Sequence, residues 1–321
     1  MTDKKIKILF SAPADFLIEY FDYYIKKYDV HFIEIWKLSD IPLITEHYDV
    51  WIPNPGQNFI INKSVVEKFS SLKIISTPST GTNHINLDDC LDKSIKVYGL
   101  MDQREGLNEI SASAEFTFLK ILSSLRNLRA SWDEVNHGRW RDNENELRGR
   151  EVKEMTYGLI GMGRIGNNLV RYLGAFGAKN IFFYDNQVDS DNLKKAKFLR
   201  LREIFENCDV VVICVALNKQ TKKMIDGTLL SKLKENAHLI NTSRGEIINE
   251  TDLVSFLHTR EDIRFSADVL SGEVENRSLN QELLSLHYKK RIDITPHIAG
   301  ATVGSQKKAA ILAFDMVQHH V

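Results

Sequence analysis

The stretch "TYGLIGMGRIGNNLVRYLGAFGAKNIFFYD", residues 156–185, decides the fold of this chain. An apolar run leads into a turn that carries Gly161, Gly163 and Gly166 in a G-x-G-x-x-G pattern. Apolar residues then recur at helical spacing, and a second apolar run ends in Asp185. A strand, a glycine turn, a helix and a second strand in this order predict a parallel βαβ unit.

Each glycine of this turn has a physical task in binding a dinucleotide. Gly161 permits the tight turn, Gly163 lets the backbone approach a pyrophosphate, and Gly166 lets the helix pack closely on the strand. The helix start offers unpaired N–H groups to the phosphates. Asp185 lies about 20 residues after the last glycine of the turn. A carboxylate at this position accepts hydrogen bonds from the ribose hydroxyls of NAD and repels the 2′-phosphate of NADP. An isolated pattern of this kind is usually an ordinary turn, but here the whole context favours NAD.

Short apolar runs alternate with helical patterns along the rest of the chain. Because many of the runs are continuously apolar, they predict parallel strands that are covered on both faces. The alternation predicts an α/β fold with two doubly wound parallel-sheet domains. The predicted strands cover residues 6–12, 31–35, 49–53, 73–77, 96–100, 156–161, 180–185, 209–216, 237–243, 264–270 and 292–296.

Composition excludes several classes of protein. Of 321 residues, 43% are hydrophobic and 26% charged, and the net charge of −1 provides no basic face for a nucleic acid. The longest apolar run, residues 210–217, is too short to span a membrane. Cys90, Cys208 and Cys214 lack metal-ligand spacing and indicate reduced thiols in a cytoplasmic protein without a metal site.

A helical segment and a polar arm separate the two sets of strands. Apolar residues at helical spacing from Ile110 to Leu128 predict one long, largely apolar helix. Trp132 and Trp140 follow in an otherwise charged stretch, which indicates burial against another surface. The alternative is a loop that packs on its own domain.

Together these segments resemble the D-isomer-specific 2-hydroxyacid dehydrogenases, a family that includes phosphoglycerate, glycerate and D-lactate dehydrogenases, with formate dehydrogenase as a relative. The match runs from about residue 73 to the C-terminus, in the family's order and spacing. The segments that carry it, besides the glycine turn, are "STGTNHINLD" (79–88), "SASAEFTF" (111–118), "INTSRGEIIN" (240–249), "ADVLSGE" (267–273) and "TPHIAGAT" (295–302).

The resemblance implies a Rossmann NAD domain, residues 104–293, inserted in a flavodoxin-like substrate domain made of residues 1–103 and 294–321. It implies a homodimer and a small 2-hydroxyacid or 2-oxoacid as substrate. The residues that it places around NAD are Gly161, Gly163, Arg164, Ile165, Gly166, Asp185, Ala216, Thr242, Asp268 and His297.

The resemblance also implies a catalytic group of Arg244, Glu273 and His297. Imidazole titrates close to neutral pH, so His297 suits the transfer of the hydroxyl proton, and a carboxylate partner would orient it. The guanidinium fork of Arg244 suits a substrate carboxylate, which backbone amides at Thr80 and Gly81 would also bind. Glu275 offers a second carboxylate, but Glu273 has the family spacing from Asp268.

Several features depart from the family pattern or leave alternatives open. Val274 and Ala216 replace expected prolines. The segment 99–115 is longer than usual and polar, which suggests a substrate more polar than lactate. Formate or glyoxylate chemistry is one alternative, although the formate reaction would call for glutamine in place of Glu273. A non-catalytic NAD-sensing module, like the corepressors that share this scaffold, is the other.

Overall fold

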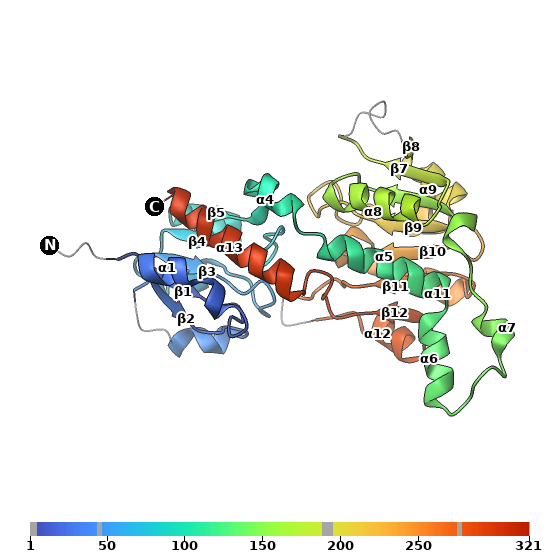
Figure 1. Cartoon of the computed structure of the whole chain (residues 1–321), viewed down its shortest axis with the longest axis horizontal. Helices are drawn as coiled ribbons and strands as arrows, with labels where there is room; N and C mark the ends of the chain where they lie inside the picture. The colour runs from blue at the N-terminus through green and yellow to red at the C-terminus, as the bar shows by residue number, and fades with distance from the viewer. Residues whose placement is uncertain (1–4, 44–46, 188–194, 275–277, 321) are drawn as a thin grey trace. The chain divides into compact units, whose positions relative to one another are not determined.

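A computed structural model of the chain describes residues 5–43, 47–187, 195–274 and 278–320 (Figure 1). It divides into two compact units, each with its own parallel sheet. The first unit comprises Met1–Ile110, Glu273–Ser278 and Ala301–Val321, and the second comprises Ser111–Gly272 and Leu279–Gly300.

The chain changes from one unit to the other after Ile110, Gly272, Ser278 and Gly300. The sequence predicts changes after residues 103 and 293. The reason at the first change is packing, since Leu107 and Ile110 are buried with Leu312 in one apolar cluster. The short helix between the two sheets therefore belongs to the first unit.

The sheet of the first unit has the strand order β2-β1-β3-β4-β5, and all neighbours are parallel. This is the flavodoxin-like order, in which the connections reverse direction between β1 and β3. Each strand overlaps one of the apolar runs that predict it. The bounds are β1 (Lys7–Phe10), β2 (Asp29–Phe32), β3 (Val50–Ile52), β4 (Ile74–Ser76) and β5 (Lys96–Tyr98).

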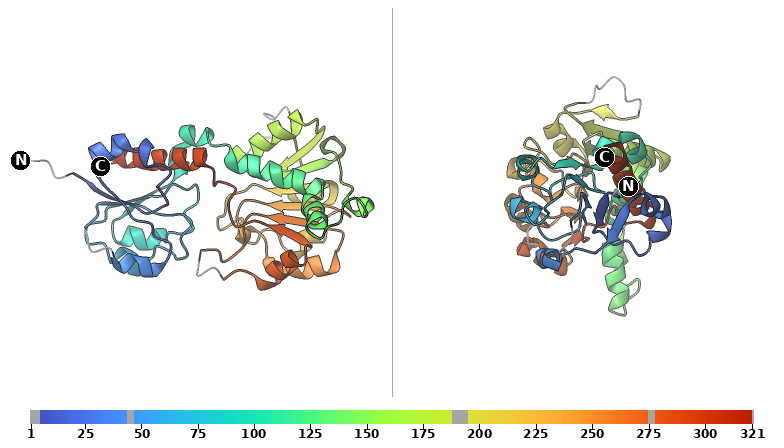
Figure 2. Two further views of the ribbon diagram at one scale, coloured as in Figure 1. Left: turned by 60° about the horizontal axis from the view of Figure 1, so that its bottom comes forward. Right: turned by 90° about the vertical axis from the view of Figure 1, so that its left-hand side faces the viewer.

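Helices cover both faces of this sheet (Figure 2). On one face α1 (Asp22–Lys27) and α13 (Val303–His320) bury Phe21 and Phe314 against Phe10 of β1. On the other face α2 (Lys63–Val66) and α3 (Leu87–Asp92) enclose a second apolar cluster. The remaining helix of this unit is α4 (Arg104–Asn108), and 3-10 turns lie at Ile18–Tyr20, Leu38–Leu43 and Leu100–Asp102.

The sheet of the second unit has seven parallel strands in the order β12-β11-β10-β9-β6-β7-β8. From β6 outward this is the Rossmann order, with its switch point between β6 and β9. The sequence missed β8, because its two exposed residues form no apolar run. The bounds are β6 (Thr156–Ile160), β7 (Asn180–Tyr184), β8 (Lys197–Phe198), β9 (Val210–Ile213), β10 (His238–Asn241), β11 (Arg264–Ala267) and β12 (Ile292–Ile294).

Two layers of helices enclose this second sheet. α5 (Ala112–Leu125) and α8 (Arg164–Ala175) pack side by side on one face (Figure 1). The other face carries α9 (Leu201–Asn207), α10 (Gly227–Leu230), α11 (Glu250–Thr259) and α12 (Gln281–Tyr288). The remaining elements are α6 (Leu128–Asn136), α7 (Glu144–Leu147) and 3-10 turns at Val152–Glu154 and Gly245–Ile247.

The prediction of one long helix from Ile110 to Leu128 is wrong. α5 ends at Leu125, and α6 starts anew after Asn127, whose φ of +47° lies in the left-handed region that asparagine tolerates. Trp132 and Trp140, in the arm that follows, are 64% and 73% exposed. Both rings therefore face away from their own unit.

Among the helices that the structure describes, none has the length and apolar character needed to cross a membrane. Within the same residues, no three histidine, cysteine, aspartate or glutamate side chains gather in a way that could hold a metal ion. Cys90, Cys208 and Cys214 are free thiols, and burial raises the pKa of Cys90 to about 11 and that of Cys208 to about 12.

Candidate active site

The glycine turn lies at the carboxyl end of β6, at the switch point of the seven-stranded sheet. Gly161 has a φ of +101°, and a Cβ on it would lie 2.8 Å from the backbone nitrogen of Val215. A Cβ on Gly166 would lie 2.3 Å from the carbonyl oxygen of Gly161. A larger residue at either position would clash with backbone, as the sequence pattern predicts.

Gly163 differs from the other two glycines. Its φ is −73°, and no atom lies within 4 Å of a Cβ built on it. The fold itself therefore does not require glycine there, and the open space lies at the N-terminus of α8. A ligand whose phosphates approach this backbone closely explains why a side chain is absent.

Asp185 closes the turn from the end of β7. Its Oδ2 accepts a hydrogen bond from the Met162 amide at 2.7 Å, and its Oδ1 accepts one from the Gln187 amide at 2.8 Å. The Asn167 side chain also donates to the Met162 carbonyl at 2.7 Å. These bonds fix the carboxylate beside the glycine turn, where a ribose would follow the pyrophosphate.

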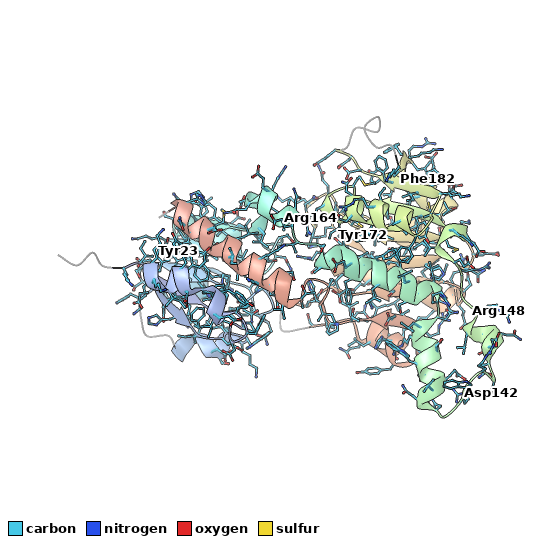
Figure 3. All side chains as sticks on the ribbon, viewed as in Figure 1. Tyr23, Asp142, Arg148, Arg164, Tyr172 and Phe182 are labelled. Carbon is cyan, nitrogen blue, oxygen red and sulfur yellow. The ribbon has the colours of Figure 1, made fainter. Side chains whose placement is uncertain are left out.

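Arg164 begins α8 and is labelled in Figure 3. Burial lowers the pKa of its guanidinium from the usual value. A guanidinium and the positive end of a helix dipole at one helix start attract anionic groups. With the space at Gly163 and the fixed carboxylate of Asp185, the residues present fit an NAD molecule.

The Arg244 turn follows β10 and is held by Asn241. The Asn241 side chain accepts from the Ser243 amide at 3.1 Å and donates to the Arg244 carbonyl at 3.0 Å. The guanidinium of Arg244 donates to the Ser243 carbonyl at 2.7 Å. This asparagine therefore fixes the backbone from which the Arg244 side chain extends.

Thr242 and Ala216, both predicted cofactor residues, lie at the same edge of the sheet. The hydroxyl of Thr242 hydrogen-bonds to that of Thr117 in α5 at 2.6 Å. The Ser243 hydroxyl donates to the carbonyl of Val215, which precedes Ala216 in the loop after β9. The loop after β10 is thus hydrogen-bonded to α5 and to the loop after β9 at the carboxyl edge of the sheet.

Asp268 joins the Arg244 turn to the His297 turn. Its amide donates to the Asn241 carbonyl at 2.9 Å, and its own carbonyl accepts from the His297 amide at 2.8 Å. Backbone hydrogen bonds of Asp268 therefore connect the carboxyl ends of β10, β11 and β12, which lie side by side in one row. Arg244 and His297 both belong to this row, at the edge where ligands bind in open α/β sheets.

The carboxylate of Asp268 also fixes the His297 turn. It accepts from the Thr295 hydroxyl at 2.6 Å and from the amides of Ile298 and Ala299 at 3.1 and 2.7 Å. His297 itself has a φ of +54°, which few non-glycine residues adopt. The residues on both sides of His297 are hydrogen-bonded to the fully buried carboxylate of Asp268, and these bonds hold the backbone of His297 in place. His297 itself is exposed.

Other predicted residues lie in the first unit. Thr80 and Gly81 follow β4, and the Gly81 amide donates to the Ser79 hydroxyl at 3.2 Å. Glu273 is partly buried and belongs to a short segment of this unit. Its rival Glu275 lies outside the described residues.

The longer segment 99–115 starts beside Ser79, the residue before Thr80 and Gly81. The Leu100 amide donates to the Ser79 carbonyl at 3.0 Å, and the Asp102 carboxylate accepts from the Gly99 amide at 2.9 Å. Farther along, Arg104 and Glu105 line a cavity of about 710 Å³ with the end of α13. Of the polar side chains of this segment, Asp102 therefore caps a backbone amide, and Arg104 and Glu105 line the cavity.

Sequence reasoning missed two residues that hold the site. Asn241 was readable from its place before a turn, because asparagine side chains often bond to the backbone two residues on. Glu250, at the start of α11, accepts from the Ser271 amide at 2.6 Å. No local pattern signals this contact, which joins residues far apart in the chain.

The comparisons with known proteins agree with this geometry. A sequence model described as "D-isomer specific 2-hydroxyacid dehydrogenase, NAD binding domain" matches residues 118–299, more than half of the chain. The human glyoxylate reductase/hydroxypyruvate reductase is 30% identical, over 76% of this chain and 72% of that protein. The glyoxylate reductase of Thermofilum pendens is 32% identical, over 79% of this chain and 73% of its own length.

Solved structures extend the likeness over nearly the whole chain. The D-lactate dehydrogenase of Aquifex aeolicus, solved with NAD and lactic acid, superposes with a TM-score of 0.81 at 26% identity. The match covers 97% of this chain and 94% of that one. The second unit is thus an NAD-binding Rossmann domain of an oxidoreductase, and the chain belongs to the D-isomer specific 2-hydroxyacid dehydrogenase family.

Proposed function

We propose that this chain is an NAD-dependent dehydrogenase that interconverts a D-2-hydroxyacid and its 2-oxoacid, with His297 as acid and base. The observation that carries the proposal is the Asp268 network. It fixes the unusual backbone of His297 and ties it to the Arg244 turn at the ligand-binding edge of the NAD domain.

In this mechanism NAD supplies the hydride acceptor, or NADH the donor. The chain binds the cofactor through the start of α8 and the loops at the carboxyl edge. Asp185 accepts hydrogen bonds from the ribose hydroxyls of NAD, and its charge disfavours the 2′-phosphate of NADP. The proposed cofactor residues are Gly161, Gly163, Arg164, Ile165, Gly166, Asp185, Ala216, Thr242, Asp268 and His297.

The remaining residues act on the substrate. The Arg244 guanidinium binds the substrate carboxylate and polarises the reacting oxygen, and amides at Thr80 and Gly81 complete the anion site. A ring nitrogen of His297 takes the hydroxyl proton during oxidation and returns it during reduction. Glu273 hydrogen-bonds to the imidazole and orients it.

A polar 2-hydroxyacid is the proposed substrate class. The segment 99–115 begins against Ser79, next to Thr80 and Gly81, and its Asp102 carboxylate caps the Gly99 amide there. The two glyoxylate-reducing relatives act on small polar oxoacids by name. A formate reaction is disfavoured because Glu273 is not glutamine, and a non-catalytic sensor is disfavoured because all three catalytic residues are retained.

A panel of substrates tests this proposal. NADH oxidation is followed at 340 nm with pyruvate, glyoxylate, hydroxypyruvate and a phosphorylated 2-oxoacid, and NAD reduction is followed with formate. We expect turnover with at least one polar oxoacid, a lower rate with pyruvate and none with formate. NADH binding without turnover of any 2-oxoacid would instead support the sensor.

We also propose that the enzyme is a cytoplasmic homodimer that assembles through the NAD domain. The three free cysteines suit a reducing compartment. Large apolar side chains are exposed on the helices and arm of this domain, which a partner subunit would cover. They are Leu119, Trp132, Val135, Trp140 and Phe176.

A further inference from the structure

The loop that carries Glu273 has both of its stems in the NAD domain. It leaves β11 through Ser271 and Gly272, and it returns through Leu279 and Asn280 to the start of α12. A catalytic carboxylate on such a loop acts at a fixed place only if something holds the stems, because loop residues otherwise sample many conformations.

Glu250 interacts with both stems. Its Oε1 accepts a hydrogen bond from the Ser271 amide at 2.6 Å, two residues before Glu273. The Asn280 side chain lies near enough to the Glu250 carboxyl group to lower its pKa. The Oδ1 of Asn280 accepts the amides of Glu282 and Leu283, so the NH₂ group is the end of this side chain that is available to Glu250.

The surroundings of Glu250 indicate a dedicated position rather than a solvated helix start. Burial raises the pKa of its carboxyl group, and Glu246 adds a like charge, while the bonds from Ser271 and Asn280 oppose the rise. Next to it, a Cβ on Gly245 would lie 2.1 Å from the Ser271 nitrogen. The backbone of Gly245, which follows Arg244, therefore packs directly against the stem that Glu250 bonds to.

We infer that Glu250 is a positioning residue, which acts on the reaction only through Glu273 by holding both stems of its loop. The inference rests on the proposed function, in which Glu273 orients the His297 imidazole. Glu250 need not touch substrate or cofactor for this role, and its contribution to stability alone would not alter the pH dependence of the reaction.

The test compares pH profiles of kcat/KM for reduction of the best 2-oxoacid in four variants of the full-length protein. These are Glu250→Gln, Glu273→Gln, the double variant, and Glu282→Gln as a matched control. Glu282 is also an acid in the first turn of a helix, α12, but its side chain is 67% exposed and pairs with His258.

Losing the carboxylate partner of an imidazole lowers the pH at which the imidazole gives up its proton. We expect Glu273→Gln to move the basic limb of the profile by about one unit to lower pH. Glu250→Gln moves the limb in the same direction, the double variant moves it no farther than Glu273→Gln, and Glu282→Gln leaves it in place. Coupled residues show this lack of additivity.

The possible failures are distinguishable. An unmoved limb in Glu273→Gln overturns the role of Glu273 in the proposed function, and this inference with it. A normal shift in Glu273→Gln, with an unmoved limb in Glu250→Gln or additive shifts in the double variant, overturns this inference alone. Should Glu250→Gln fold poorly, Glu250→Asp keeps the charge but withdraws the carboxylate from both stems, and the same shift is expected.

Discussion

At the scale of single residues, Asp268 determines the geometry around His297. The resemblance identifies it only as a residue of the cofactor site, and sequence alone does not show where its carboxylate points. In the structure this carboxylate is fully buried and bonded to both sides of the His297 turn. Its contribution to the site is therefore the shape of that turn.

Replacing Asp268 by asparagine removes one of these acceptors. The amide NH₂ would face the amide of either Ile298 or Ala299, which leaves a buried donor without a partner. We expect the free energy of unfolding to fall by about 2 kcal/mol, measured by urea denaturation. Turnover should fall as well, and a variant with unchanged stability and turnover would contradict the role of this network.

Gly163 and Gly174 form a matched pair for testing the cofactor turn. Neither would bring a Cβ within 4 Å of another group, and both positions lack a left-handed φ. We expect Gly163→Ala to fold normally but bind NADH at least about tenfold more weakly, because a methyl group would occupy the space of the phosphates.

Gly174→Ala is the control, since Gly174 lies near the end of α8, away from the turn. It should bind NADH normally and gain up to about 1 kcal/mol in stability from its helix propensity. Titration of NADH fluorescence and thermal unfolding measure both effects. Equal NADH affinity in the two variants would remove Gly163 from the phosphate site.

Residues in local motifs could be predicted, and those in long-range contacts could not. The glycine turn is recognisable because three glycines serve one backbone path within six residues of chain. Glu250 gave no such signal, because its partners Ser271 and Asn280 become neighbours only when β10, β11 and α11 have packed together.

At the scale of elements, α5 shows what apolar spacing reveals and what it omits. The spacing predicts a buried helix, and Phe118, Ile121 and Leu125 do face the core. It does not predict the row of polar contacts that α5 makes with the sheet. Lys120 pairs with Asp293 at 2.9 Å, and Ser124 bonds to His238 at 2.7 Å.

His238 makes this contact sensitive to acid. Burial, with a smaller effect of the nearby Arg264 charge, lowers the pKa of His238 to about 4. The unfolded chain binds this proton at about pH 6.5, so stability is complete above that pH and declines as the pH falls toward 4. The full loss is of the order of 3 kcal/mol.

Urea denaturation of wild type and His238→Gln between pH 7 and 4 measures the effect. The comparison rests on the slope of stability against pH, because the substitution itself also changes stability throughout this range. We expect a shallower slope in the variant, since the group that gains a proton on unfolding has been removed. Parallel slopes would show that His238 does not contribute to acid unfolding.

At the scale of the whole molecule, alternating apolar runs predicted both parallel sheets. Eleven predicted strands overlap strands of the structure, and among the strands of the described residues only the edge strand β8 was missed. The change between units was harder to predict, because it depends on whether α4 packs on α13. That is a property of side-chain contacts, such as Leu107 with Leu312, rather than of local sequence.

Assembly is the prediction at this scale. Trp132 and Val135 lie one turn apart on α6 and are 64% and 55% exposed. Replacing both by aspartate should shift the proposed dimer toward monomer, measured by light scattering over a range of protein concentrations. Leu91→Asp, at a site of the other unit that is 74% exposed, is the control and should leave the mass unchanged. A dimer that persists in the double variant would exclude this face.

The central claim is that His297 transfers the substrate proton, and one measurement tests it most directly. Single-turnover oxidation of bound NADH by the best 2-oxoacid is compared in wild type and His297→Gln, with NADH affinity measured in the same samples. The account predicts a rate about 10²–10⁴-fold lower in the variant, while NADH binding survives. A variant that oxidises NADH at the wild-type rate would contradict it.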